Sequence, residues 1–273
     1  MNHLIKSYLK FLFHSKNEHG VHSPFVFDLV TNCFYDENKY PEYSILKEYR
    51  KSLLENQNTI EVTDFGAGSR VFKTNQRKIS AIAKNAGISP KNAELLFRFV
   101  RYFQPESILE IGTSLGLATS ALSLGNKNAK ITSLEGCPQT ISIAKNQCQL
   151  QNLNNIEFVN TKFEDNLKTD NRQQTTDNLI YFDGNHSKNA TIEYFELLLP
   201  TISNDSVWIF DDIHWSKDME EAWEIIKNHP KVTVTIDTFQ WGIVFFRKEQ
   251  MKEHFIINPN KTFSSYLFEL IRV

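Results

Sequence analysis

From Gln104 onward, short apolar runs alternate with segments of helical pattern, and no other feature of the chain constrains its fold as strongly. Such alternation is typical of βαβ units, which build a parallel sheet. The expected strands in this alternation are 107–111, 130–134, 156–159, 178–182 and 206–210. Two later runs, 231–237 and 242–246, lie too close together for a helical crossover and should pair antiparallel. The sequence therefore predicts an α/β fold with a doubly wound, seven-stranded, mostly parallel sheet.

Residues 1–100 do not follow this alternation and are mostly helix-like and irregular. A chain of 273 residues suits one α/β domain with extensions. We therefore expect a mainly helical N-terminal extension over 1–100, serving as a lid or as an acceptor or dimer region. A ligand-binding α/β domain should follow over 101–250, and a C-terminal extension over 251–273.

The overall charge and the cysteines restrict which classes of partner and which cellular compartment the sequence predicts. Thirty basic residues stand against 32 acidic ones, so there is no global basic field and no nucleic-acid partner is expected. Three cysteines without CxxC or zinc spacing fit a reducing, cytoplasmic compartment. Lys6 and Lys10 interrupt the apolar start, so we expect neither a secretory signal nor a membrane span. The start has the spacing of an amphipathic helix, which leaves packing on the core, a homodimer contact or a membrane-surface role open.

The segment Glu110-Ile-Gly-Thr-Ser-Leu-Gly116 lies between an apolar run and a helical segment. Glycine is needed where a backbone turns sharply against a ligand. Glu135 follows at the end of the next predicted strand, where a carboxylate can accept hydrogen bonds from both ribose hydroxyls. The third glycine of a dinucleotide fingerprint is missing, so a nucleoside without phosphates fits better than NAD. The competing interpretation is a purely structural turn.

A second acidic-glycine segment, Asp64-Phe-Gly-Ala-Gly68, follows residues 59–63. What comes after it is basic and helical, and no strand with a terminal acid appears before Ser107. We interpret it as a turn or lid element, with direct contact to the ligands as the alternative.

Three aspartates, Asp183, Asp211 and Asp212, are predicted at the ends of neighbouring strands. If they converge, the cluster has to take up protons or bind a cation. Hard oxygen ligands favour Mg²⁺ or a similar divalent ion. The alternative is that one or two of them only cap helices or close turns.

Residues 86–247 resemble the class I S-adenosylmethionine (SAM)-dependent O-methyltransferases, both the catechol and caffeoyl-CoA type and the metal-dependent sugar type. The motifs that carry the resemblance are Ile88–Leu96, Ile108–Gly116, Leu134–Pro138, Ile180–Ser187 and Ile209–His214. It implies a Rossmann-like methyltransferase fold, and SAM as the cofactor of the domain at 101–250.

The resemblance also implies roles by position. The methionine part of SAM would lie against Glu110, Gly112, Thr113, Ser114 and Gly116, with Asp183 also at the cofactor. Glu135 would hold the ribose, while Gly136, Phe163 and Glu164 would border the adenine.

The remaining implied roles concern the reaction. Asp183, Asp211 and Asp212 stand where the metal-dependent families hold a divalent cation, although the last position is often Asn there. His186 stands where the catechol type has a lysine base and some sugar methyltransferases have histidine. Histidine titrates near neutrality, so the hypothesis is that His186 and Asp183 are catalytic, with His186 as general base. His214 and Trp215 would line the acceptor pocket, or alternatively support it.

The leading hypothesis is therefore a SAM-dependent methyltransferase that methylates a hydroxyl group of a small-molecule acceptor, with or without a divalent metal. The alternatives are a metal-independent N-methyltransferase and a SAM- or nucleoside-binding protein of the same fold without catalysis. A NAD-dependent dehydrogenase fits least, because of the missing third glycine.

Overall fold

The central element of the computed structural model is an eight-stranded sheet with the order β10-β8-β9-β7-β6-β3-β4-β5. The model describes residues 3–63, 65, 72–169 and 176–260. Every pairing in this sheet is parallel except the two made by β9, with β7 and with β8. The strands are β3 (Ser107–Ile111), β4 (Lys130–Glu135), β5 (Ile156–Asn160), β6 (Leu179–Phe182), β7 (Val207–Asp211), β8 (Val234–Asp237), β9 (Trp241–Phe245) and β10 (Glu253–Ile256). The prediction of a doubly wound, mostly parallel sheet with an antiparallel terminal hairpin is confirmed.

The sheet has one strand more than predicted. β10 pairs with β8 in parallel at the edge of the sheet, so residues placed in the C-terminal extension join the fold. Glu253 and His254 are exposed in this strand and only Phe255 is buried, so the segment shows no apolar run. An edge strand with one solvated face does not need one.

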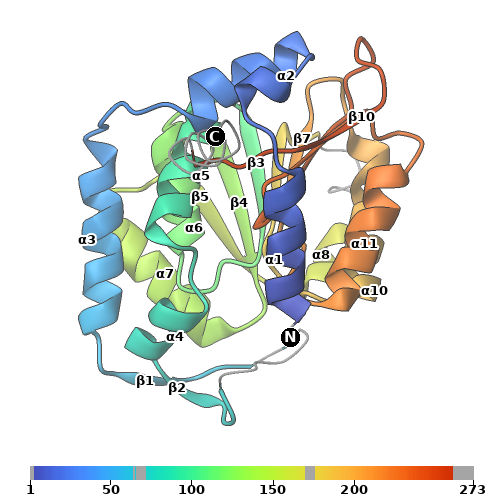
Figure 1. Cartoon of the computed structure of the whole chain (residues 1–273). Helices are drawn as coiled ribbons and strands as arrows, with labels where there is room; N and C mark the ends of the chain where they lie inside the picture. Colours follow the sequence, from blue (N-terminus) through green and yellow to red (C-terminus); the bar gives the residue numbers. More distant parts are fainter. Residues whose placement is uncertain (1–2, 64, 66–71, 170–175, 261–273) are drawn as a thin grey trace.

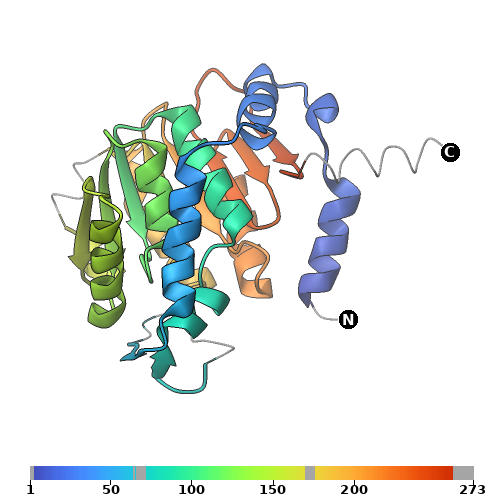
Figure 2. The ribbon, with the colours of Figure 1, turned by 90° about the vertical axis from the view of Figure 1, so that its left-hand side faces the viewer.

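Helices cover both faces of the sheet, which gives three layers (Figures 1 and 2). Alternate residues of each strand point to opposite faces. In β6, Leu179 and Tyr181 belong to one buried cluster, and Ile180 and Phe182 belong to the other. The first face is covered by α5 (Pro90–Phe103), α6 (Leu117–Gly125) and α7 (Pro138–Leu150), with α3 (Glu42–Glu55) outside them. The second is covered by α8 (Phe163–Leu167), α10 (Lys188–Leu198), the short helix η3 (Leu199–Thr201) and α11 (Lys217–Asn228).

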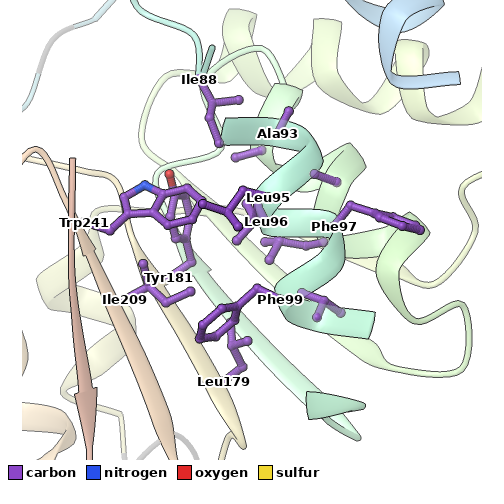
Figure 3. Close-up of a cluster of buried hydrophobic side chains, with 14 of the residues drawn as sticks. Ile88, Ala93, Leu95, Leu96, Phe97, Phe99, Leu179, Tyr181, Ile209 and Trp241 are labelled. Atoms are coloured by element: carbon purple, nitrogen blue, oxygen red, sulfur yellow. The ribbon is translucent and has the colours of Figure 1, made fainter. Parts of the chain in front are cut away.

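Helix α5 joins the N-terminal segment to the sheet. Ser89 caps its first turn through the Asn92 amide, and Pro90 begins it, as expected for a helix start. Leu95, Leu96 and Phe99 pack toward the sheet strands (Figure 3). Phe97 points the other way and contacts the rings of Tyr40 and Tyr43. The boundary predicted after residue 100 thus falls inside this helix.

The remaining N-terminal elements surround the sheet. They are α1 (His3–His14), η1 (Glu18–Gly20), α2 (Pro24–Leu29), η2 (Val30–Phe34), α4 (Ile79–Asn85) and the antiparallel hairpin of β1 (Thr59–Glu61) and β2 (Gln76–Lys78). Figure 1 places this hairpin and α4 together at one end of the molecule. In the described part of the chain, no helix combines the length and apolar character needed to cross a membrane.

Candidate active site

A rigid glycine turn follows β3. Gly112 has a φ of 107°, and a Cβ there would lie 2.3 Å from the carbonyl oxygen of Asp183, so only glycine fits. The amides of Gly112 and Thr113 both donate to the carbonyl oxygen of Leu134. Gly116 ends the turn with a φ of 78° and lies against the Tyr49 hydroxyl. The turn is therefore held between the ends of β4 and β6.

Glu135, the last residue of β4, bridges this turn to the next helix. Its Oε2 accepts a hydrogen bond from the Ser114 amide at 2.7 Å, and its Oε1 accepts one from the Cys137 amide at 2.8 Å. Burial raises the pKa of Glu135, while these backbone donors act against that rise. Asn160 donates to the carbonyl oxygens of Glu135 and Gly136 and fixes them from the β5 side. The structure thus brings together Glu135 and the glycine turn, which are separate in sequence.

Glu110 is fully buried at the end of β3. Its Oε2 accepts hydrogen bonds from the hydroxyls of Thr119 and Ser133, whereas Oε1 has no hydrogen-bond partner among the described residues. Burial raises the pKa of Glu110 to about 8, although these two hydroxyls lower it. One buried carboxyl oxygen is thus left available to a donor or a cation.

Asp183 and His186 form a pair directly after β6. Oδ1 of Asp183 lies 3.5 Å from Nε2 of His186, and the imidazole ring lies 6.1 Å from the ring of Trp215. Burial raises the pKa of Asp183, and His186 opposes this rise. For His186, burial alone would lower the pKa, but Asp183 and the charge of Asp212 outweigh burial and raise it. The imidazolium form is therefore favoured while no other cation is present.

Asp211 and Asp212 follow β7 and share a donor that the sequence did not indicate. Nε2 of Gln240 donates to Oδ1 of Asp211 at 2.7 Å and to Oδ1 of Asp212 at 2.6 Å. Asp211 also accepts from the Tyr181 hydroxyl and from the Asp212 amide. Burial and the two neighbouring aspartates raise the pKa of Asp211 well above its usual range.

These contacts bear on the metal site predicted at Asp183, Asp211 and Asp212. Among the residues that the structure describes, no group of three or more His, Cys, Asp or Glu side chains could hold a metal ion. An amide donor lies between two of the three carboxylates, at the place where a cation would have to bind. The arrangement does not fit a divalent ion, because an N–H group competes with a cation for the same oxygens. A divalent cation at Asp183, Asp211 and Asp212 therefore stays a prediction that this side-chain arrangement does not support.

Four non-glycine residues at this end of the sheet have positive φ values. Three follow neighbouring strands, namely Ser114 after β3, Asn185 after β6 and Asp212 after β7, with φ values of 49°, 51° and 57°, and the fourth is Phe239 in the turn between β8 and β9, with a φ of 73°. Such conformations cost free energy and gather at ligand sites. Their occurrence after three neighbouring strands marks this edge as the functional one.

Phe163 and Glu164, at the start of α8, border the loop after β6. A Cβ on Gly184 would lie 2.5 Å from the Phe163 ring, so the ring contacts the Gly184 backbone. Phe163 also packs edge-on against Tyr194, whose hydroxyl donates to Glu164 at 2.7 Å. Phe163 therefore lies against the residue that follows Asp183, and the place of Phe163 and Glu164 at the adenine stays a prediction.

His214 is engaged on both ring nitrogens. Nδ1 lies 2.8 Å from Glu220, Nε2 lies 2.9 Å from Asp237, and Phe239 stacks on the ring. This geometry favours the supporting role, although His214 also lines a cavity of about 620 Å³, so its place in an acceptor pocket stays a prediction. Trp215 remains beside His186.

Sequence reasoning missed two neighbours of the site, Gln240 and Phe65. Gln240 reaches Asp211 because β9 pairs antiparallel with β7, which places Trp241 opposite Asp211. Of the second acidic-glycine segment, only Phe65 lies within the described residues, and its ring contacts Gly136. The glycine-rich motif was a signal for Phe65, whereas nothing in the sequence pointed to Gln240.

A family model described as a methyltransferase domain matches residues 109–213. Among solved structures, the S-adenosylhomocysteine (SAH)-bound methyltransferase PaMTH1 of Podospora anserina has a TM-score of 0.59 and 15% identity, covering 84% of this chain and 97% of that one. The SAH complex of an O-methyltransferase from Bacillus cereus has a TM-score of 0.54 and 20% identity, covering 78% and 93%. The O-methyltransferase TomG of Streptomyces achromogenes, involved in tomaymycin synthesis and solved with SAM, has a TM-score of 0.54 and 14% identity, covering 77% and 91%. No curated protein matches the chain in sequence.

Proposed function

We propose that this protein transfers the methyl group of SAM to a hydroxyl group of a small molecule, since a family model described as a methyltransferase domain matches residues 109–213. The observation that carries the proposal is the contact of Glu135 with the Ser114 amide across the glycine turn. A ribose-binding carboxylate and a nucleoside-binding turn have to lie side by side in this way. Structures of the same fold that contain SAH or SAM support this choice of cofactor.

The charges of the site favour a cationic cofactor. Glu110, Asp183 and Asp211 are buried acids whose pKa values are raised, so ionising them without a counter-charge is unfavourable. SAM carries positive charge on its sulfonium and on its ammonium group. The free Oε1 of Glu110 can accept a hydrogen bond from such an ammonium group, while Glu135 accepts from the ribose hydroxyls. These residues suit SAM better than a neutral nucleoside.

The N-terminal extension contributes to the same region in this proposal. A hollow of about 10 Å³ is lined by residues that include Ala86 and Ile88 on one side, and Ser114 and Asp183 on the other. The connection between α4 and α5 thus lies against the glycine turn and Asp183, where the proposal places the amino-acid end of SAM. This agrees with the lid role expected for the extension.

In the proposed reaction, SAM supplies an electrophilic methyl group, and the protein aligns the acceptor oxygen with it and removes a proton. Asp183 interacts with Nε2 of His186 and leaves Nδ1 to accept the hydroxyl proton. The cofactor's positive charge favours the neutral imidazole, because it opposes the carboxylates that raise the pKa of His186. Trp215 lies beside the imidazole and can pack against the acceptor. No step of this mechanism uses a metal ion.

The substitution His186→Ala tests this mechanism. Turnover should fall about 10²–10⁴-fold, the usual contribution of a general base, while SAH binds as tightly as to the wild type. The matched control is His19→Ala, because the side chain of His19 is 80% exposed on η1. SAH formation from SAM is measured with hydroxylated and amine acceptors, and affinity for SAH and NAD is measured by calorimetry. An unchanged rate in His186→Ala would contradict the base, whereas the absence of SAH binding to the wild type would contradict the proposed function itself.

A further inference from the structure

The chain segment after β1 is fixed to the start of α7. The Glu61 amide donates to Oε1 of Gln139 at 2.8 Å, and the Thr63 amide lies 3.5 Å from Sγ of Cys137 as its donor. Val62, between them, belongs to the same buried cluster as Cys137. Residues 61–63 are therefore held against the residues that directly follow Glu135 and Gly136.

This attachment brings Phe65 onto Gly136. A Cβ on Gly136 would lie 2.6 Å from Cδ2 and 3.0 Å from Cε2 of the ring, so the ring edge rests on the Gly136 backbone and leaves no room for a side chain. Lys162 also lies near Phe65, with its Nζ 5.6 Å from the centroid of the Phe65 ring. Phe65 keeps 49% of its surface exposed. About half of the surface of a large apolar side chain is thus exposed to solvent beside the proposed ribose-binding carboxylate of Glu135.

We propose that Phe65 stacks on the adenine ring of SAM and helps to determine that the base is adenine-like, an inference that rests on the proposed function. In the proposed function Glu135 holds the ribose, and the Phe65 ring fills the space beside the next residue, Gly136, which has no side chain to exclude it. The base attached to that ribose then lies next to the Phe65 ring. Stacking covers the exposed surface of the ring and gives the base an aromatic partner.

Phe65 lies outside the part of the chain that the family model matches, and this affects how the cofactor site is built. Phe65 belongs to the N-terminal extension, whereas Glu135 and Gly136 belong to the methyltransferase domain that matches the family model. The adenine site is therefore completed by a residue outside the matched domain. Cofactor affinity then depends on how residues 61–63 sit on Cys137 and Gln139.

Calorimetry with SAH on the full chain tests this inference. Phe65→Ala should weaken SAH binding about tenfold or more, in the range that stacked bases lose on removal of an aromatic partner. Phe65→Tyr keeps the ring and should bind as the wild type does. Phe27→Ala is the matched control, because Phe27 on α2 is similarly exposed, at 44%. 5′-Methylthioadenosine has the base and the sugar but lacks the amino-acid end, so it should lose affinity by the same factor as SAH.

The possible results distinguish a failure of the stacking inference from a failure of the proposed function. If the wild type binds SAH and Phe65→Ala binds it equally well, the stacking inference is overturned and the proposed function stands. If the wild type does not bind SAH, the proposed function fails first.

A second readout is optical. Phe65→Trp adds an indole at the stacking position, and its emission should be quenched by SAH beyond any change seen for the four native tryptophans of the wild type. Equal fluorescence changes in the variant and the wild type, with SAH bound to both, would overturn the inference.

Discussion

Glu110 links the stability of this protein to pH through one buried carboxyl group. In the unfolded chain it ionises near 4.5, whereas burial in the folded state raises its pKa to about 8. Between these values the folded protein retains a proton that the unfolded chain has released, so its contribution to stability falls as the pH rises through this window. Each pKa unit corresponds to about 1.4 kcal/mol.

The substitution Glu110→Gln removes this titration and keeps an acceptor for Thr119 and Ser133. We expect the free energy of unfolding of the wild type to fall more between pH 5 and pH 8 than that of Glu110→Gln, by up to a few kcal/mol. Urea denaturation of both proteins at the two pH values measures the difference. If the free energy of unfolding of the two proteins changes equally between these pH values, Glu110 is not the cause of the pH dependence.

The residues of the site were predictable to different degrees. Glu110, Glu135 and Asp183 could be placed together because parallel strands bring their carboxyl ends to one edge, and each of these residues lies at or directly after the last two positions of a strand. The contacts of Gln240 depend on how a hairpin turn aligns with a strand elsewhere in the chain. Local patterns do not determine that alignment, so its effect on the predicted metal site was not foreseen.

At the scale of elements, apolar runs predicted the strands of the central sheet from β3 to β9 and failed only for β10, at one edge of that sheet. The last predicted pair began at residue 231, but β8 begins at Val234. The amides of Lys231 and Val232 bond back to His229 and close a turn there. β10 escaped prediction because an edge strand is stabilised by its backbone pairing, which leaves little trace in the composition.

The turn between β8 and β9 has a functional consequence at the same scale. It presents the Gln240 amide to Asp211 and Asp212, where an N–H donor offsets the crowding of carboxylates that a divalent ion would otherwise relieve. We therefore expect methyl transfer to proceed at the same rate with EDTA as with added Mg²⁺. Initial rates in the two conditions measure this, and a loss of activity in EDTA that Mg²⁺ restores would contradict it.

At the scale of the whole molecule, the N-terminal segment and the sheet share one core. Leu46, Tyr49 and Leu53 of α3 belong to the same buried cluster as strand residues such as Ile108 and Ile131. Tyr49 also donates to the Leu115 carbonyl oxygen at 3.0 Å, beneath the glycine turn. The extension is thus part of the folded unit that holds the site.

Deleting residues 1–88 should therefore abolish cooperative folding, although α5 and every strand of the central sheet remain. The apolar surface uncovered on α5 and α6 would face water, and burial contributes roughly 25 cal/mol per Å². Circular dichroism during urea titration and binding of a hydrophobic dye measure the effect, with deletion of residues 1–2 as the control. A truncated protein that unfolds in one sharp transition and binds SAH would contradict the shared core.

The contact between Lys16 and Ile257 joins the two ends of the described chain. The Lys16 amide donates to Ile256 at 2.8 Å, and the Asn258 amide donates back to Lys16 at 3.4 Å, beside the outermost strand. Backbone groups at an open sheet margin can recruit a strand from another molecule. Here the backbone of Lys16 takes up part of that margin, so fewer of its backbone groups are left to pair with a strand of another molecule.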